Sequence, residues 1–257
     1  MVVWTSAWLH GAVAADDVLD ALQPWAESHE VRAADDELAT RLDLPGPEDA
    51  PAGPAMLLAA LRRAGAASGE LVLPVPGDAR GLGGGGEFGK QAMRAGEAAV
   101  LPEARIGLVP RTAAEGIIRW TAFDTGELPP AEHVPIGEAE HGMSSAMREA
   151  ATALIELGVA KRRPGVREEI AETVASQPSA TWPPEIPQRA LRVLQRATEV
   201  AAILWVATED APGGALSASA MRGRTQALRP LFDSVRTARR AAVAEMVREL
   251  AQHADNH

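Results

Sequence analysis

The residues best suited to chemistry gather between Gly77 and Lys90, where four consecutive glycines stand among charged side chains. Backbone amides in a glycine loop before a helix can approach and attract an anion, and a nearby lysine supports a phosphate. The segment therefore predicts either a phosphate-binding loop or a surface connection. Its candidate ligand-binding residues are Asp78, Arg80, Gly83, Gly84, Gly85, Gly86 and Lys90.

Three details of this loop weaken the phosphate-loop interpretation. The run from Gly84 to Lys90 matches the first seven positions of G-x-x-x-x-G-K, but Gln91 stands where a Ser or Thr would bind magnesium. Glu87 would repel a polyphosphate, and seven residues separate Pro76 from Gly84. Asp78 and Arg80 suit either substrate orientation or ordinary turn hydrogen bonds. A hinge or surface connection is therefore favoured over a ligand site.

No complete catalytic constellation is present elsewhere. Cysteine is absent, which excludes disulfides and thiol catalysis, and no G-x-S-x-G elbow occurs. The segment from Glu132 to His141 holds two His and three Glu, but its spacing matches no metal motif, and Pro135 and Gly137 predict a loop. We therefore assign no catalytic residue, no metal and no cofactor.

Charge is distributed unevenly along this acidic chain, whose net charge is −10. Residues 1–50 carry eleven acidic side chains and two arginines, whereas residues 219–250 carry seven arginines and three acidic side chains. The basic segment is predicted to contact a partner or the acidic segment, within one chain or between chains. An acidic protein is a poor candidate for nucleic-acid binding. The candidate partner-binding residues are Arg222, Arg236, Arg239 and Arg240.

The middle of the chain predicts a small mixed β-sheet. The first 68 residues have the pattern of helices separated by turns, with Asp35 and Pro54 at two helix starts. A helix is expected over residues 87–95, between the first two strands. The predicted strands are Leu71–Val75, Ala98–Leu101, Ile106–Val109 and Ile117–Phe123.

From about residue 141 the pattern is helical to the end. One apolar stripe is Met143, Met147, Ala150, Leu154 and Leu157, and a second is Leu191, Leu194, Thr198, Ala201 and Trp205. A third stripe consists of Leu228, Leu231, Val235, Ala242, Met246 and Leu250. Pro230 lies within it and should kink or restart the helix. The fold class is therefore α+β, with an α/β region at residues 1–124, a linker at 125–140 and an α-helical bundle at 141–257.

Leu73–Leu82, together with Gly96–Ala98 and Gly107–Pro110, resembles an uncharacterised protein family of actinobacteria. The resemblance implies no particular activity, so the function must be argued from the residues themselves.

The features above favour a non-catalytic cytoplasmic protein that binds a protein partner or associates with itself as a homo-oligomer. No apolar run is long enough to span a membrane, and the apolar N-terminus lacks the basic residues of a signal peptide. The alternative is a protein or enzyme that binds a small molecule or nucleotide phosphate through Gly77–Lys90.

Overall fold

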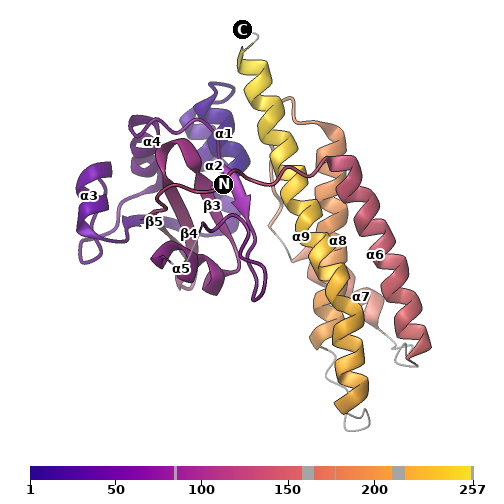
Figure 1. Ribbon diagram of the computed structural model, residues 1–257. Coiled ribbons are helices and arrows are strands. Elements are labelled where there is room, and N and C mark those ends of the chain that lie inside the picture. The colour runs from indigo at the N-terminus through magenta and orange to yellow at the C-terminus, as the bar shows by residue number, and fades with distance from the viewer. Residues whose placement is uncertain (84–85, 158–164, 177, 210–217, 256–257) are drawn as a thin grey trace. The chain divides into compact units, whose positions relative to one another are not determined.

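The computed structural model describes residues 1–83, 86–157, 165–176, 178–209 and 218–255. The chain has the predicted α+β fold and divides into two compact units (Figure 1). We call them the sheet unit (Met1–Glu132, Ser179–Pro187 and Val243–His257) and the helical unit (His133–Pro178 and Gln188–Ala242). Helix α9 (Ala218–Asp255) contributes to both.

The sheet unit contains a five-stranded mixed sheet of order β1-β5-β4-β3-β2. β1 is parallel to β5, and all other neighbours are antiparallel. The four predicted strands are therefore confirmed, although the first one is shorter and ends at Val72. The strands are β1 (Ser28–Ala33), β2 (Glu70–Val72), β3 (Ala98–Leu101), β4 (Ile106–Ala114) and β5 (Ile117–Asp124).

The expectation that the first 68 residues are all helical is wrong, because Ser28–Ala33 forms the edge strand β1. His29, Val31 and Ala33 are buried, whereas the residues between them are partly exposed. Only one of the three inward residues is a typical strand former, so the alternation carries a weak signal. Pairing with β5, distant in sequence, supplies the missing stability.

The helices of the sheet unit before and between the strands begin largely as predicted. Asp35 caps α3 by accepting a hydrogen bond from the Leu38 amide at 2.8 Å, and Pro54 is the first residue of α4. Trp8, Val18 and Leu58 join α1, α2 and α4 in one apolar cluster. The helices are α1 (Val2–Leu9), α2 (Ala15–Leu22), α3 (Asp36–Leu42), α4 (Pro54–Arg63) and α5 (Glu87–Ala95).

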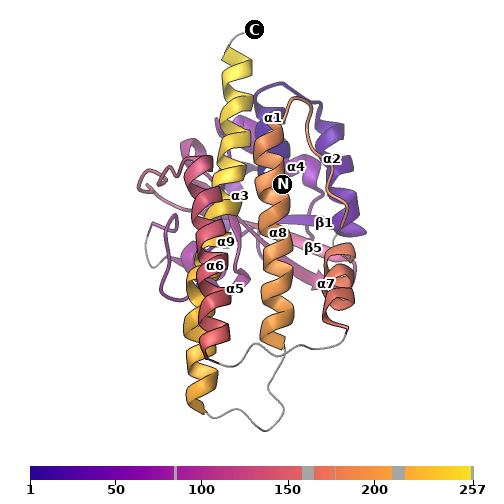
Figure 2. The ribbon, with the colours of Figure 1, turned by 90° about the vertical axis from the view of Figure 1, so that its right-hand side faces the viewer.

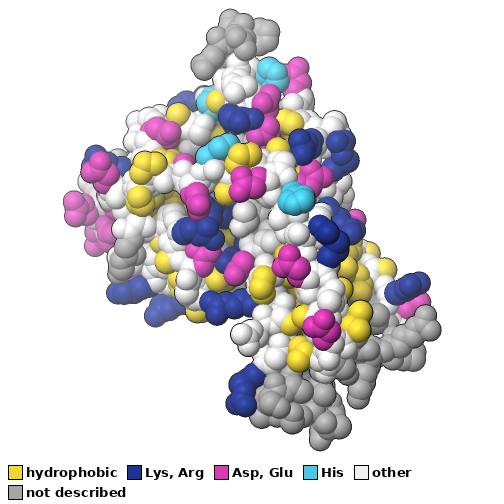
Figure 3. Space-filling view, turned by 45° about the vertical axis from the view of Figure 1, so that its right-hand side comes forward, with side chains coloured by type: hydrophobic (Ala, Val, Ile, Leu, Met, Phe, Trp, Pro, Cys, Tyr) yellow, Lys and Arg dark blue, Asp and Glu magenta, His cyan; other side chains and the backbone are white. Residues whose placement is uncertain are grey.

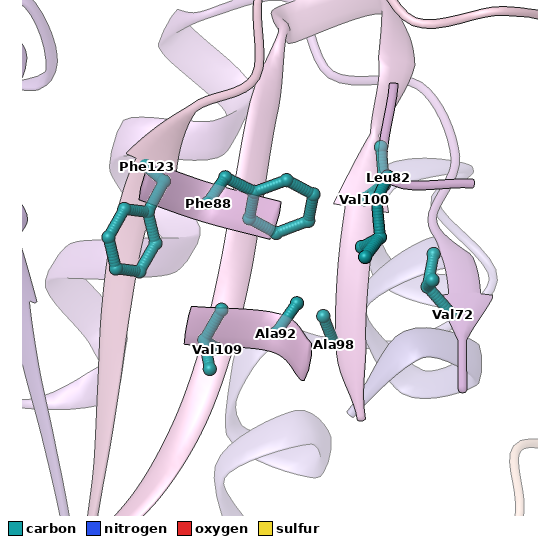
Figure 4. Packing of buried hydrophobic residues seen from close by; sticks show 8 residues of the cluster. All are labelled: Val72, Leu82, Phe88, Ala92, Ala98, Val100, Val109 and Phe123. Atoms are coloured by element: carbon teal, nitrogen blue, oxygen red, sulfur yellow. The ribbon is translucent and has the colours of Figure 1, made fainter. Parts of the chain in front are cut away.

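Helix α5 covers one face of the sheet and forms its main apolar cluster there (Figure 4). Phe88 of α5 lies over the strands, and its ring is 6.2 Å from that of Phe123 on β5. Gly107 on β4 leaves room for this ring, since any β-carbon there would overlap it. The remaining members of the cluster are Val72, Leu82, Ala92, Ala98, Val100 and Val109.

The helical unit consists of long helices that run beside one another (Figure 1 and Figure 2). Arg189 of α8 pairs with Glu140 of α6 at 2.9 Å, and Arg224 of α9 donates to the carbonyl of Ala207 in α8. No helix in the described part of the chain is long and apolar enough to cross a membrane. The helices are α6 (Ile136–Glu156), α7 (Val166–Ala175), α8 (Gln188–Glu209) and α9.

Three expectations for this half of the chain are corrected. The loop predicted up to His141 is helical from Ile136, because Pro135 precedes the helix and Gly137 is tolerated within it. α9 continues through Pro230, so of the two expected effects of this proline, a kink or a restart, the restart is contradicted. On α8 the fully buried series lies one residue before the predicted stripe and consists of Ala190, Val193, Ala197, Val200 and Leu204.

Candidate functional site

The segment after β2 is held against the sheet unit at both ends. The backbones of Val75 and Asp78 exchange two hydrogen bonds, of 3.0 and 2.8 Å, around a tight turn in which Gly77 has φ +90°. Only glycine adopts that conformation without strain. Leu82 is buried in the core beneath α5. The described part of the loop is therefore a packed connection.

Asp78 and Arg80 are paired with each other. Arg80 donates two hydrogen bonds of 2.8 Å to the Asp78 carboxylate and a third, of 2.9 Å, to Glu132. The hydrogen bonds from Asp78 and Glu132 raise the pKa of Arg80 above its already high value. This arrangement matches the turn-forming interpretation of the pair. Arg80 thereby ties the loop to the segment that precedes the helical unit.

The glycines that the structure describes serve packing and helix capping. Gly83 has φ +66°, and a β-carbon there would overlap Leu128 Cδ2. Gly86 is the N-cap of α5, and Lys90 lies 3.5 Å from the Glu87 carboxylate. Gly84 and Gly85 lie outside the described residues. The assignment of these glycines and Lys90 to a ligand remains a prediction.

Gln91, which occupies the magnesium-ligand position of a phosphate loop, has a partner within its own helix. Its amide donates a 2.8 Å hydrogen bond to Glu87. This bond, followed by a weaker one from Lys90, lowers the pKa of the Glu87 carboxyl. The glutamine therefore stabilises the charged form of the carboxylate at the start of α5.

We expect Gln91→Ala to raise the pKa of Glu87 toward its ordinary range, because the largest stabilisation of the carboxylate is lost. An NMR titration of the Glu87 side-chain carboxyl would measure this change. Lys90→Met should raise the pKa less, since its contact is longer at 3.5 Å. An unchanged titration in Gln91→Ala would contradict the assigned cause.

The four arginines predicted to bind a partner are spread along about five turns of α9. Arg222 is exposed, whereas Arg236 is largely buried and pairs with Asp233 at 3.1 Å. Arg239 and Arg240 are half-buried. The four arginines thus differ in exposure, and their role in partner binding remains a prediction.

Sequence reasoning missed an apolar surface at one end of the helical unit. Within this end, Leu157 after α6 lies against Gly223 of α9, and Arg224 joins α9 to the end of α8. Figure 3 shows hydrophobic side chains at the surface near the lower end of the helices. We call this the apolar end and define it by the exposed residues Ile155, Leu157, Ile203, Trp205 and Met221, of which Ile203 and Trp205 point to different sides of α8.

The apolar end was missed because periodicity places Leu157 and Trp205 on inward stripes. In the structure Trp205 is 60% exposed and Leu157 is 44% exposed. α8 has two adjacent apolar series, and the one with smaller side chains at Ala190 and Ala197 is buried. Small residues let neighbouring helices approach closely, which leaves the bulkier series at the surface.

Comparisons with known proteins identify the family but no activity. The Rv1486c-like N-terminal domain matches residues 1–133, and the Rv1486c-like C-terminal domain matches residues 137–240. The chain is 38% identical to the uncharacterised protein Rv1486c of Mycobacterium tuberculosis, with 95% of each chain covered. It is 35% identical to ML1804 of Mycobacterium leprae, with 94% of each chain covered. No solved structure gives a significant match.

These similarities extend over both units, and they confirm the resemblance to an uncharacterised actinobacterial family seen in the sequence. The chain belongs to the Rv1486c-like protein family.

Proposed function

We propose that this protein is a non-catalytic binding protein whose helical unit associates with a second copy of the same chain. The observation that carries the proposal is the apolar end, where five large apolar side chains are exposed. Large apolar side chains left exposed on several helix ends of one unit are candidates for an interaction site. Trp205 is the natural anchor of such a contact, since buried tryptophans contribute strongly to protein interfaces.

The uneven charge of the chain favours a second copy as the occupant. Each copy carries both an acidic segment, residues 1–50, and a basic segment, residues 219–250. A twofold dimer can bring the acidic segment of each copy near the basic segment of the other, so the attraction is made twice. This attraction offsets the repulsion between two chains of net charge −10.

The test is a measurement of mass in solution over micromolar protein concentrations by light scattering. The intact chain should form a dimer that dissociates more readily as salt is raised. Trp205→Ala should raise the dimer dissociation constant by about 30-fold, the equivalent of ~2 kcal/mol for a central interface residue. Trp205 is well exposed, so this substitution should leave the fold intact.

Trp25→Ala is the matched control, because Trp25 is also exposed, at 49%, but lies in the sheet unit. It should leave the dissociation constant unchanged. A strict monomer at every concentration would overturn the proposal. Equal weakening by Trp25→Ala and Trp205→Ala would overturn the assignment of the interface to the apolar end.

A further inference from the structure

A hollow of about 360 Å³ lies on the face of the sheet that α5 covers only in part. Its floor is formed by β1, β5 and β4, and one wall is the first turn of α5. We call it the arginine pocket. Its principal lining residues are Arg32, Arg111, Arg119, Thr121, Val109 and Phe123.

Strand register brings Arg32 beside two arginines of the β4–β5 hairpin, Arg111 and Arg119. Arg119 on β5 lies directly opposite Arg111 on β4, and on its other side it faces Glu30 of β1. One row further, Arg32 lies opposite Thr121. Because side chains alternate along a strand, all of these residues point to the same face of the sheet.

Two of the three arginines are held in place by neighbouring groups. Glu30 accepts a 2.8 Å hydrogen bond from Arg119 Nε and lies 2.6 Å from its Nη2. The Pro47 carbonyl accepts one 3.0 Å bond from Arg32 Nη1. Arg111 has no hydrogen bond or ion pair with any residue that the structure describes. Its guanidinium is therefore available to a ligand.

The pocket is basic although the chain is strongly acidic. Three arginines and one carboxylate, Glu87, line it, and Glu87 accepts a hydrogen bond from Gln91 and lies 3.5 Å from the Lys90 ammonium. Like charges placed directly opposite on neighbouring strands repel each other, and Glu30 neutralises only Arg119. With Glu30 paired to Arg119, the charges of Arg32 and Arg111 have no carboxylate partner among the described residues, and a bound anion would supply one.

We propose that the arginine pocket binds a small organic anion that carries a carboxylate or phosphate group. Guanidinium groups recognise both groups through paired hydrogen bonds. The Thr121 side chain lies among the arginines, and Val109 and Phe123 present an apolar surface beside them. The ligand therefore combines an anionic head with a compact apolar body, and the volume is suited to a small molecule.

This site is independent of the proposed self-association, since all its residues belong to the sheet unit. It also differs from the site predicted at Gly77–Lys90. Of the lining residues, only Glu87 belongs to that segment, and Gln91 follows it directly. Sequence reasoning had no signal for it, because Arg32, Arg111 and Arg119 form no motif along the chain.

The test adds phenyl phosphate to the full chain, measures its binding by calorimetry, and measures the change in the melting temperature of the protein. Phenyl phosphate should bind and raise the melting temperature, inorganic phosphate should bind more weakly, and neutral benzyl alcohol should not bind. Arg111→Ala should weaken phenyl phosphate binding by about ten-fold or more, since a charged hydrogen-bond donor is lost. Arg192→Ala, an exposed arginine in the helical unit, is the matched control and should bind normally.

A second measurement separates ligand binding from a structural role. Without ligand, Arg111→Ala should melt no lower than the intact chain, because the substitution removes a charge opposed to Arg119. No binding of phenyl phosphate, or equal binding by the intact chain and Arg111→Ala, would overturn the proposal. Tight binding of single-stranded DNA that phenyl phosphate cannot displace would also overturn it in favour of a nucleic-acid surface.

Discussion

Replacing Gly107 with valine should lower the free energy of unfolding of the sheet unit by about 3 kcal/mol or more. A β-carbon at this position would lie 2.5 Å from Phe88 Cδ2 and 2.8 Å from Cζ, well inside contact distance. The Phe88 ring is only 3% exposed and is enclosed by the cluster shown in Figure 4, so it cannot swing aside. Valine is the better strand former, so the loss must come from packing.

Urea denaturation followed by an NMR signal of the sheet unit, such as the Trp120 indole, would measure this loss. Phe88→Ala opens the space that valine needs, so the double variant should be more stable than the sum of the two single effects predicts, by about 1 kcal/mol or more. Gly142→Ala is the control for the replacement of a glycine at a position where the added side chain meets no other group. No atom outside its own helix backbone lies within 4 Å of an added β-carbon there, and stability should rise by about 0.5–1 kcal/mol.

If Gly107→Val proved as stable as the intact chain, the close packing of Phe88 on β4 would be contradicted. Additivity of Gly107→Val and Phe88→Ala would contradict it equally.

Replacing His29 with alanine should cost about 3 kcal/mol of stability. The buried imidazole bridges β5 and α2: Trp120 Nε1 donates to its Nδ1 at 3.1 Å, and its Nε2 bonds the Leu22 carbonyl at 2.8 Å. An indole N–H can only donate and a carbonyl can only accept, so His29 must carry its proton on Nε2. Alanine would leave both partners buried without a bond and would open a cavity.

The imidazole nitrogen shifts of His29 in an NMR spectrum would report this tautomer directly. Trp120→Phe removes the donor and leaves His29 Nδ1 unpaired. The double variant His29→Leu, Trp120→Phe removes both ends of that bond and should cost less than the sum of His29→Leu and Trp120→Phe measured singly, by about 1 kcal/mol. A proton on Nδ1, or additive costs, would contradict the bridge.

Local sequence signals predicted those elements whose formation depends on residues only a few positions apart. The aspartate cap at Asp35, the proline start at Pro54 and the alternating strand Ile117–Phe123 each act over a few residues. Sequence patterns that are compatible with more than one conformation led to wrong or incomplete predictions. The polar strand Ser28–Ala33 was not recognised, and the two adjacent apolar series on α8 did not show which of them is buried.

For the candidate sites, the sequence identified the glycine loop but could not assign partners within it. Asp78 and Arg80 were recognised as a pair that suits a turn, whereas the third partner, Glu132, lies 52 positions away from Arg80. The exposure of Trp205 depends on how α8 rotates against its neighbours, and no local pattern encodes that rotation.

Composition and periodicity thus suffice for the α+β class and the helical C-terminal half, because these depend on residue type and short spacing. The arginine pocket depends instead on which strands pair in the sheet. Arg32, Arg111 and Arg119 become neighbours because β1 pairs in parallel with β5, and β5 pairs in turn with β4. That pairing is selected by burial of the whole sheet between its helices, and such a choice is made by contacts among residues far apart in the chain.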